Sequence, residues 1–155
     1  MNLKHLNILL ADDDIDDCIF FKEALGELMI STDLTTVHDG EQLMQLLTNE
    51  INELPHILFL DLNMPRKNGF ECLSEIKQNS KLKDLPVIIF STSFEHEVVN
   101  LLYKSGAQYF IRKPSVFLQF KEIILHALLL ILDESISHST KEDFVLTVRN
   151  NLAVK

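Results

Sequence analysis

Residues 57–69 read ILFLDLNMPRKNG, and this stretch decides the fold. The four apolar residues Ile57–Leu60 are followed at once by the carboxylate of Asp61, and the turn-forming pair Asn68-Gly69 comes soon after. A short, continuously apolar run is typical of a strand in a parallel sheet, because helices cover both faces of such a sheet. We therefore expect a buried strand that carries Asp61 to the carboxyl edge of the sheet.

More short apolar runs of the same kind lie on either side of this strand along the chain. They are Leu6–Ala11, Leu34–Val37, Val87–Phe90 and Tyr109–Ile111. The segments between the runs have apolar residues at helical spacing, as in Cys18, Phe21, Leu25 and Leu28. This alternation of five strands with five helices predicts an α/β fold with right-handed crossovers and a doubly wound, open parallel sheet.

The C-terminal part of the chain has a different pattern. Residues 133–143, DESISHSTKED, are polar and look like a linker, and the following FVLTVRNNLAVK fits either a short strand or a short helix. A chain of 155 residues suits one compact domain. We expect a domain over residues 1–132, then a C-terminal linker and short tail over residues 133–155, without an output domain such as a DNA reader.

The composition argues against several classes of function. Acidic residues outnumber basic ones by 23 to 14, and the net charge of -9 disfavours binding to nucleic acid or to an anionic membrane. The apolar stretch at residues 123–132 is too short to cross a bilayer. The two cysteines, Cys18 and Cys72, suit reduced thiols better than a disulfide framework. We expect a soluble, cytoplasmic protein without a targeting segment.

Polar side chains follow the strands at the edge where open parallel sheets bind their ligands. The first strand ends in Asp12-Asp13-Asp14, the third in Asp61, the fourth in Ser91-Thr92 and the fifth in Arg112-Lys113-Pro114. Carboxylates, hydroxyls and a lysine are therefore expected to converge at one edge of the sheet.

The acidic residues have two competing explanations. Asp14, Asp16 and Asp17 suit a cap or the first turn of the helix after the first strand, where the helix dipole favours acidic side chains, and we expect this role for Asp16 and Asp17. Capping does not explain why Asp61, from a different strand, approaches Asp12 and Asp13. Two carboxylates about 4 Å apart repel by about 4 kcal/mol at an effective dielectric of about 20, so a cation must hold them. Mg²⁺ suits this role, because it prefers a few carboxylates together with phosphate oxygens.

The other polar groups suit a phosphoryl group on Asp61. Lys113 brings a second positive charge from the fifth strand, and the Ser91 hydroxyl is able to donate to an anionic oxygen. An aspartyl phosphate adds about two negative charges, which the metal ion and the lysine together offset.

The motifs are DDD after the first strand, DLNMPRKNGF after the third, VIIFSTS on the fourth and YFIRKP on the fifth. In this order and spacing they resemble the receiver domain of bacterial two-component response regulators, over about residues 5–131. The resemblance implies a flavodoxin-like (βα)5 fold, a five-stranded parallel sheet with the strand order 2-1-3-4-5.

The resemblance also implies a role for each residue of the cluster. Asp61 is the phosphoacceptor, and Lys113 pairs with the phosphoryl group. Mg²⁺ is held by the carboxylates of Asp12, Asp13 and Asp61 and by the backbone carbonyl of Asn63.

A second set of residues is implied to act around the phosphoryl group. Ser91 is the catalytic and switch hydroxyl, and Phe110 is the switch aromatic, which rotates inward as Ser91 moves toward the phosphate. Thr92 and Ser93 lie beside the path by which water reaches the phosphorus. Relatives usually have a cis bond before the proline that is Pro114 here.

The implied function is that of a single-domain response regulator. Asp61 accepts a phosphoryl group from the phosphohistidine of a sensor histidine kinase or phosphotransfer protein, and the changed surface signals to other proteins. Such a domain catalyses only its own phosphorylation and dephosphorylation, so we do not expect an ordinary enzyme. One alternative, a haloacid-dehalogenase-type hydrolase, needs a second carboxylate where this chain has Asn63. The other is a static binding domain that is never phosphorylated.

The predicted fifth helix has a surplus of apolar surface. At about 100° per residue, one stripe is expected to face the core: Phe117, Phe120, Ile124, Leu128 and Ile131. Further apolar residues remain on the flanks: Leu118, Ile123, Leu125, Leu129, Leu130 and Leu132. Either the FVLTV segment folds back over them or a second copy of the chain covers them. We favour a homodimer through this helix.

Overall fold

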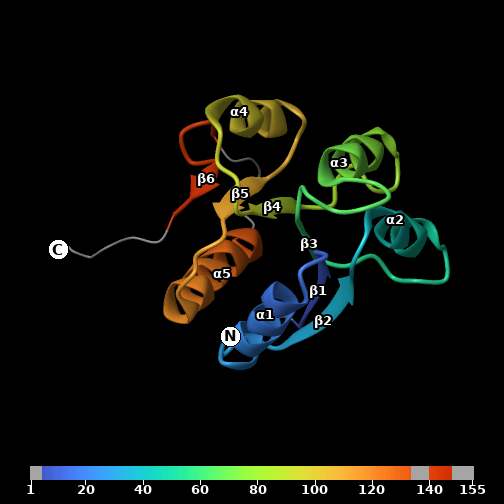
Figure 1. The fold of residues 1–155 in the computed structure, drawn as a ribbon. Helices are drawn as coiled ribbons and strands as arrows, with labels where there is room; N and C mark the ends of the chain where they lie inside the picture. Colours follow the sequence, from blue (N-terminus) through green and yellow to red (C-terminus); the bar gives the residue numbers. More distant parts are fainter. Residues whose placement is uncertain (1–4, 134–139, 148–155) are drawn as a thin grey trace.

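The computed structural model describes residues 5–133 and 140–147, which form one parallel sheet with helices on both faces (Figure 1). The strands are β1 (Leu6–Ala11), β2 (Thr32–Val37), β3 (Ile57–Leu60), β4 (Val87–Ser91), β5 (Tyr109–Arg112) and β6 (Val145–Leu146). The helices are α1 (Ile15–Gly26), α2 (Gly40–Thr48), α3 (Gly69–Gln78), α4 (His96–Lys104) and α5 (Phe117–Leu132). The strand order is β2-β1-β3-β4-β5-β6, which confirms the doubly wound α/β fold and the order 2-1-3-4-5 of the first five strands.

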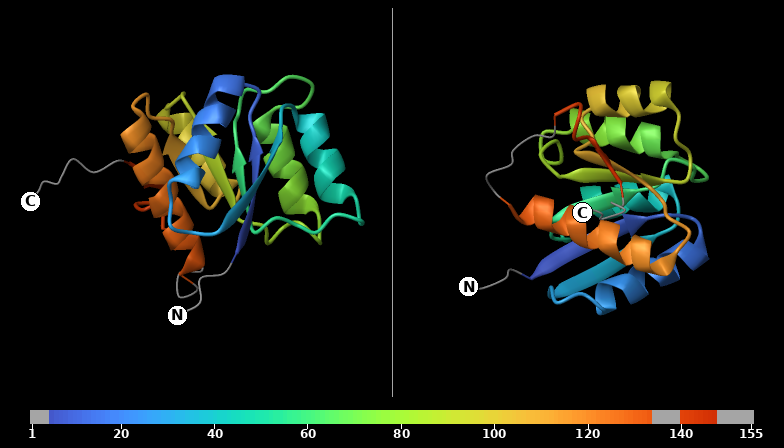
Figure 2. Two further views of the ribbon diagram at one scale, coloured as in Figure 1. Left: turned by 90° about the horizontal axis from the view of Figure 1, so that it is seen from below. Right: turned by 90° about the vertical axis from the view of Figure 1, so that its left-hand side faces the viewer.

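Two apolar cores, one on each face of the sheet, hold the layers together. Helices α2, α3 and α4 cover one face, and α1 and α5 cover the other (Figure 2). Neighbouring residues of β1 alternate between the cores, with Leu10 packed on the α1 and α5 side and Leu9 on the opposite side. Because both faces are covered, both sets of side chains must be apolar, which explains the continuous apolar runs.

The sixth strand extends the sheet beyond β5, in a segment for which the sequence left a strand and a helix both open. The Phe110 N–H donates to the Phe144 carbonyl over 2.9 Å, just before β6 begins. Phe144 is 1% exposed, and its ring meets that of Tyr103 at 5.3 Å between centroids. The start of the FVLTV segment is therefore a strand and not a helix. A strand of two residues leaves too short a pattern for recognition from sequence.

The expected domain boundary after residue 132 stays a prediction. Residues 134–139 and 148–155, which make up much of the expected linker and tail, lie outside the described residues. Phe144 and Leu146, by contrast, are buried in the two cores on opposite faces of the sheet. This part of the tail packs as an integral part of the same sheet.

Helix α5 buries a stripe that differs from the expected one. Its buried residues are Phe120, Ile123, Ile124, Ala127 and Leu128. Ile123 was expected on the flank, whereas Phe117 and Ile131, expected in the core, are only partly buried. The reason is that α5 packs against α1 as well as against the sheet: the Phe20 ring lies 6.1 Å from that of Phe117. A helical wheel gives the spacing of the residues around α5, but it does not show which of them the sheet covers and which α1 covers.

Two expectations from composition concern membranes and thiols. Across the described ranges 5–133 and 140–147, no helix has the length and apolar character that a membrane span requires. Cys18 and Cys72 are both buried, free thiols, in agreement with the expected absence of a disulfide framework.

The Asp39-Gly40 and Asn68-Gly69 pairs each start a helix. Asp39 caps α2 and Asn68 caps α3, each by accepting a backbone N–H bond from the first turn with its side-chain oxygen. The turn signal at Asn68-Gly69 is thus the start of a helix, and both helices begin beside the β3–α3 loop, residues 61–68.

Both glycines touch the backbone of this loop. A Cβ at Gly40 would lie 2.0 Å from the carbonyl oxygen of Lys67, and a Cβ at Gly69 would lie 2.4 Å from that of Asp61. Real atoms do not approach so closely, so each position requires glycine. Two helix starts thereby pack directly on the loop that carries Asp61.

Replacing Gly40 by alanine should destabilise the protein, because α2 or the loop must shift to admit a methyl group. We expect Gly40→Ala to lower the free energy of unfolding by about 3 kcal/mol and the melting temperature by about 10 °C. Gly26→Ala is the matched control, since a Cβ there meets nothing within 4 Å. Thermal denaturation followed by circular dichroism measures both, and equal melting temperatures would contradict the close approach at Gly40.

Candidate functional site

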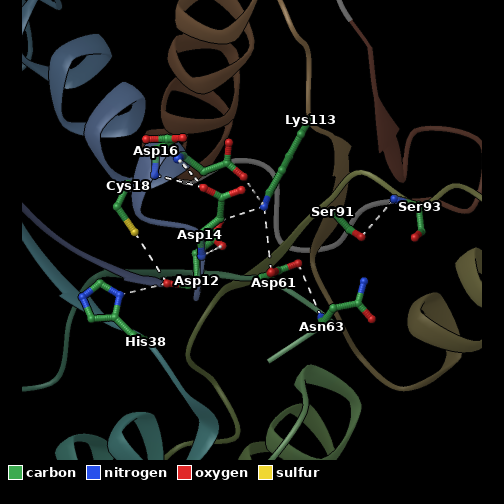
Figure 3. Close-up of polar contacts among 11 residues, drawn as sticks. Asp12, Asp14, Asp16, Cys18, His38, Asp61, Asn63, Ser91, Ser93 and Lys113 are labelled. Atoms are coloured by element: carbon green, nitrogen blue, oxygen red, sulfur yellow. Dashed lines mark hydrogen bonds and ion pairs between the residues drawn. The ribbon is translucent and has the colours of Figure 1, made fainter. Parts of the chain in front are cut away.

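The carboxyl ends of four parallel strands meet at one edge of the sheet, and polar residues stand at these ends (Figure 3). Asp12 follows β1, Asp61 follows β3, Ser91 ends β4 and Lys113 follows β5. The backbone ladder continues past the strands: the Asp61 N–H donates to the Ala11 carbonyl over 2.9 Å, and the Lys113 N–H donates to the Ser91 carbonyl over 2.8 Å. The expected convergence is confirmed, and the ladder fixes its geometry.

Three of the carboxylates form a candidate metal site. Asp12, Asp13 and Asp61 each offer one oxygen, and these oxygens lie within 4.8 Å of one another. Asp12 and Asp61 are buried and Asp13 is exposed. This donor set fits a hard divalent cation that keeps part of its water shell, such as Mg²⁺. Asn63 is exposed, and its N–H lies 3.5 Å from Asp61 Oδ1; its carbonyl as a ligand stays a prediction.

Lys113 supplies the positive charge in the middle of the cluster. Its side chain is 6% exposed, and its Nζ lies 2.7 Å from Asp12 Oδ2 and 2.8 Å from Asp17 Oδ2. The distance to Asp61 Oδ2 is 3.9 Å, which is within ion-pair range but too long for a hydrogen bond. The lysine is therefore anchored on the β1–α1 side of the site, and its link to Asp61 is the weakest of the three.

Asp16 and Asp17 lie in the first turn of α1, as the sequence predicted, but the contact of Asp17 with Lys113 was not expected. Asp14 is the N-cap of α1, and its carboxylate accepts from the backbone N–H groups of Asp16 and Asp17. The Asp17 carboxylate is therefore free to pair with Lys113. A sequence signal existed, because Asp17 lies one turn before the buried Phe21 and so faces the sheet.

Burial controls the protonation of the central groups. It raises the pKa of Asp61 to about 7, an effect that the charge of Lys113 opposes and that of Asp12 reinforces. Burial likewise raises the pKa of Asp12, against the hydrogen bond from Lys113. Burial alone would lower the pKa of Lys113, but its hydrogen bonds to Asp12 and Asp17 outweigh this and raise it. The lysine is a cation at neutral pH, and Asp61 is poised between its two forms.

Two side chains that the sequence reasoning missed hold the backbone of Asp12. The carbonyl oxygen of Asp12 accepts from His38 Nδ1 at 3.0 Å and from Cys18 Sγ at 3.5 Å. Burial raises the pKa of the Cys18 thiol to about 11, so it keeps its proton and remains a donor. These contacts tie the end of β1 to β2 and α1. No sequence pattern marks them, because each depends on the packed position of one side chain.

The remaining predicted residues lie at the ends of β4 and β5. Ser91 is fully buried, and its Oγ accepts from the Ser93 N–H at 3.2 Å, while Thr92 and Ser93 are exposed. Phe110 is 0% exposed and meets the Phe94 ring at 5.9 Å, so it already points inward. Their roles in switching and phosphoryl access stay predictions. The implied cis bond before the proline is wrong, because the described residues contain no cis peptide bond.

Comparison with known sequences agrees with this geometry. The family model described as the response regulator receiver domain matches residues 8–125. This chain belongs to that family. The receiver domain is similar to the response regulator Rcp1 of Synechocystis sp., with 34% identity over 110 residues, which is 68% of this chain and 75% of Rcp1.

Solved structures show the same likeness. The phosphorylated cyanobacterial phytochrome response regulator RcpA superimposes with a TM-score of 0.78 at 29% identity, covering 88% of this chain and 100% of RcpA. The Mn²⁺-bound form of Rcp1 superimposes with a TM-score of 0.74 at 28% identity, covering 87% of this chain and 99% of Rcp1. The receiver domain described here is thus a response regulator domain of the two-component type, with an acidic cluster suited to a metal ion.

In metal-free buffer this receiver domain should lose stability as the pH rises. Asp61 binds its proton more tightly when folded, with a pKa of about 7, than at the ordinary value of 3.8. Between these values the folded state holds more protons than the unfolded state, so the free energy of unfolding falls with rising pH. Asp61→Asn removes this effect and should be about 1 to 4 kcal/mol more stable than wild type near pH 8.

Urea denaturation in the presence of a chelator measures this difference. The advantage of Asp61→Asn should disappear near pH 4, where Asp61 is protonated in the folded protein. A constant difference between the two proteins across this pH range would contradict the raised pKa.

Proposed function

We propose that this chain is a response regulator in which Asp61 accepts a phosphoryl group from the phosphohistidine of a histidine kinase or phosphotransfer protein, with Mg²⁺ as cofactor. The observation that supports it most directly is the position of Asp61. It is a buried carboxylate that shares an edge of the sheet with two further carboxylates and lies 3.9 Å from Lys113.

The residues of the site account for the chemistry of the transfer. An oxygen of ionised Asp61 attacks the phosphorus in line, a P–O bond forms, the P–N bond to imidazole breaks, and the imidazole leaves with its electron pair. Lys113 favours the ionised form of Asp61 and faces the oxygens on which negative charge accumulates. Asp12, Asp13 and Asp61 would hold Mg²⁺, which supplies further positive charge next to those oxygens. The domain thereby catalyses its own modification and is not an enzyme acting on other substrates.

Apolar surface beside the site suits a protein as the phosphoryl donor. Ile15 begins α1 two residues after Asp13, and Val116 lies three residues after Lys113. The two apolar side chains are 55% and 53% exposed. Apolar side chains next to a reactive group are typical of protein docking surfaces. Since solved relatives include a phytochrome response regulator, a photoreceptor kinase is the first donor to test.

The proposal also covers the kind of partner and the cellular compartment, which rest on the net charge and on the cysteines. The net charge of -9 disfavours nucleic acid and anionic membranes as direct partners. The buried, free thiols suit the reducing environment of the cytoplasm.

Incubation with acetyl phosphate and Mg²⁺ tests the phosphoacceptor. The wild-type protein should gain one acid-labile phosphoryl group, Asp61→Asn should gain none, and omission of Mg²⁺ should slow the reaction more than tenfold. Asp16→Asn is the matched control, because it removes a carboxylate from the exposed side of α1 and should leave the gain intact. Intact-protein mass spectrometry reads the result. An unmodified wild-type protein, or modification of Asp61→Asn, would refute the proposal.

We also propose a homodimer through α5, as the sequence suggested. Leu118 and Leu129 on this helix are 57% and 51% exposed, and the tail segment at β6 pairs with β5 without covering them. Exposed leucines on a helix that is otherwise packed fit a surface shared by two copies of the chain.

Sedimentation over a concentration series measures the dimer. The wild-type protein should dimerise, and Leu118→Lys together with Leu129→Lys should shift the dissociation constant upward by at least tenfold. Leu101→Lys is the control, because Leu101 is 52% exposed on α4. A wild-type monomer at every concentration, with and without phosphorylation, would exclude the dimer.

A further inference from the structure

The ion pair between Lys113 and Asp17 has no function in the transfer described above. Asp17 is not the cap of α1, because Asp14 has that role. It lies outside the group of carboxylates that suit a metal ion. Its carboxylate nevertheless accepts a hydrogen bond of 2.8 Å from the central lysine. Figure 3 shows Lys113 reaching toward Asp12 and the first turn of α1.

This contact competes with the phosphoryl group for the lysine. An ammonium group has three N–H donors, and two of them are taken by Asp12 and Asp17. Asp61 lies 3.9 Å away, beyond hydrogen-bond distance. A phosphoryl group on Asp61 is therefore left with the one remaining N–H of Lys113, and any further hydrogen bond requires the lysine to give up Asp12 or Asp17.

Of the two anchors, Asp17 is the one that yields more easily. The side chain of Asp12 is 0% exposed, so loss of its partner would leave a buried charge without compensation. The side chain of Asp17 is 23% exposed, so water is able to solvate its carboxylate after the lysine has left. Movement of Lys113 toward Asp61 should therefore break the Asp17 contact first.

We propose that Asp17 is a positioning residue that holds Lys113 away from Asp61 in the resting protein and weakens binding of the phosphoryl group. This inference rests on the proposed function of Asp61. It makes the free energy of the phosphorylated state depend on a carboxylate that touches neither the phosphoryl group nor the metal ion. Loss of the Asp17 charge should favour the state in which Lys113 pairs with the phosphoryl group.

Binding of beryllium trifluoride, a phosphoryl analogue, tests the proposal without any turnover. Asp17→Asn should bind the analogue about fivefold more tightly than wild type at saturating Mg²⁺, as loss of one competing ion pair implies. Asp17→Glu keeps the charge and should restore an affinity near that of wild type. Asp16→Asn removes the same charge from the neighbouring, exposed position and should have no effect. Titration followed by fluorine NMR of the bound analogue gives the affinities.

A double-mutant cycle separates competition from a general effect of charge. In a Lys113→Met background no lysine is left to compete for, so Asp17→Asn should no longer tighten binding. Equal affinities for Asp17→Asn and Asp16→Asn would overturn the proposal, and so would a gain that persists without Lys113 or a weaker binding of Asp17→Asn. Thermal denaturation checks that each variant is folded, and Asp17→Ser replaces Asp17→Asn if the latter is not.

The wild-type protein distinguishes this proposal from the one on which it rests. A wild type that binds the analogue while the Asp17 variants do not differ from their controls refutes only the positioning role. A wild type that fails to bind at all refutes Asp61 as a phosphoryl site, and the positioning role with it.

Discussion

Two buried carboxylates that approach each other need positive charge between them, and the arrangement of the site follows from this need. Asp12 and Asp61 are 0% and 5% exposed, so water screens their repulsion only weakly. Lys113 contacts Asp12 at 2.7 Å and approaches Asp61 to 3.9 Å. Burial raises the pKa of Asp61 to about 7, and the charge of Lys113 opposes this rise while that of Asp12 adds to it. The excess negative charge is what suits the site to a divalent cation.

The fold brings the carboxylates together as a consequence of its backbone geometry. In a parallel sheet all strands deliver their next residue to the same edge, and the ladder bond from Asp61 to Ala11 fixes the spacing of β1 and β3. Because Gly40 and Gly69 have no side chain, the starts of α2 and α3 pack directly against the backbone of the β3–α3 loop. Helices cover both faces of the sheet and form apolar cores there, so the polar side chains of the site lie at the carboxyl ends of the strands.

The same contacts link the site to the surface around it. Lys113 belongs to the connection from β5 to α5, and Asp17 belongs to α1, so their ion pair joins the starts of two helices that pack side by side (Figure 1). Ile15 and Val116 are exposed at these same helix starts. A change of charge at Asp61 therefore acts on Lys113, and the ion pair of Lys113 with Asp17 connects it to the helix start that carries Ile15. Strand β6 meanwhile covers the edge of β5, which would otherwise present unpaired backbone groups.

By itself, the sequence determined the order of strands and helices and the chemistry at the strand ends. These follow from local patterns: apolar runs mark buried parallel strands, and parallel strands place Asp12, Asp61, Ser91 and Lys113 at one edge whatever the details of packing. The resemblance to receiver domains added the roles of these residues.

Only the tertiary structure decided which neighbours these residues contact. Asp16 and Asp17 are adjacent, identical side chains that both suit a first helical turn, but a rotation of about 100° turns one to solvent and the other to Lys113. The pairing of β6 with β5 and the buried stripe of α5 were likewise hidden. Asp17 and Lys113 are separated by 96 positions along the chain, and contacts of this kind depend on how whole elements pack.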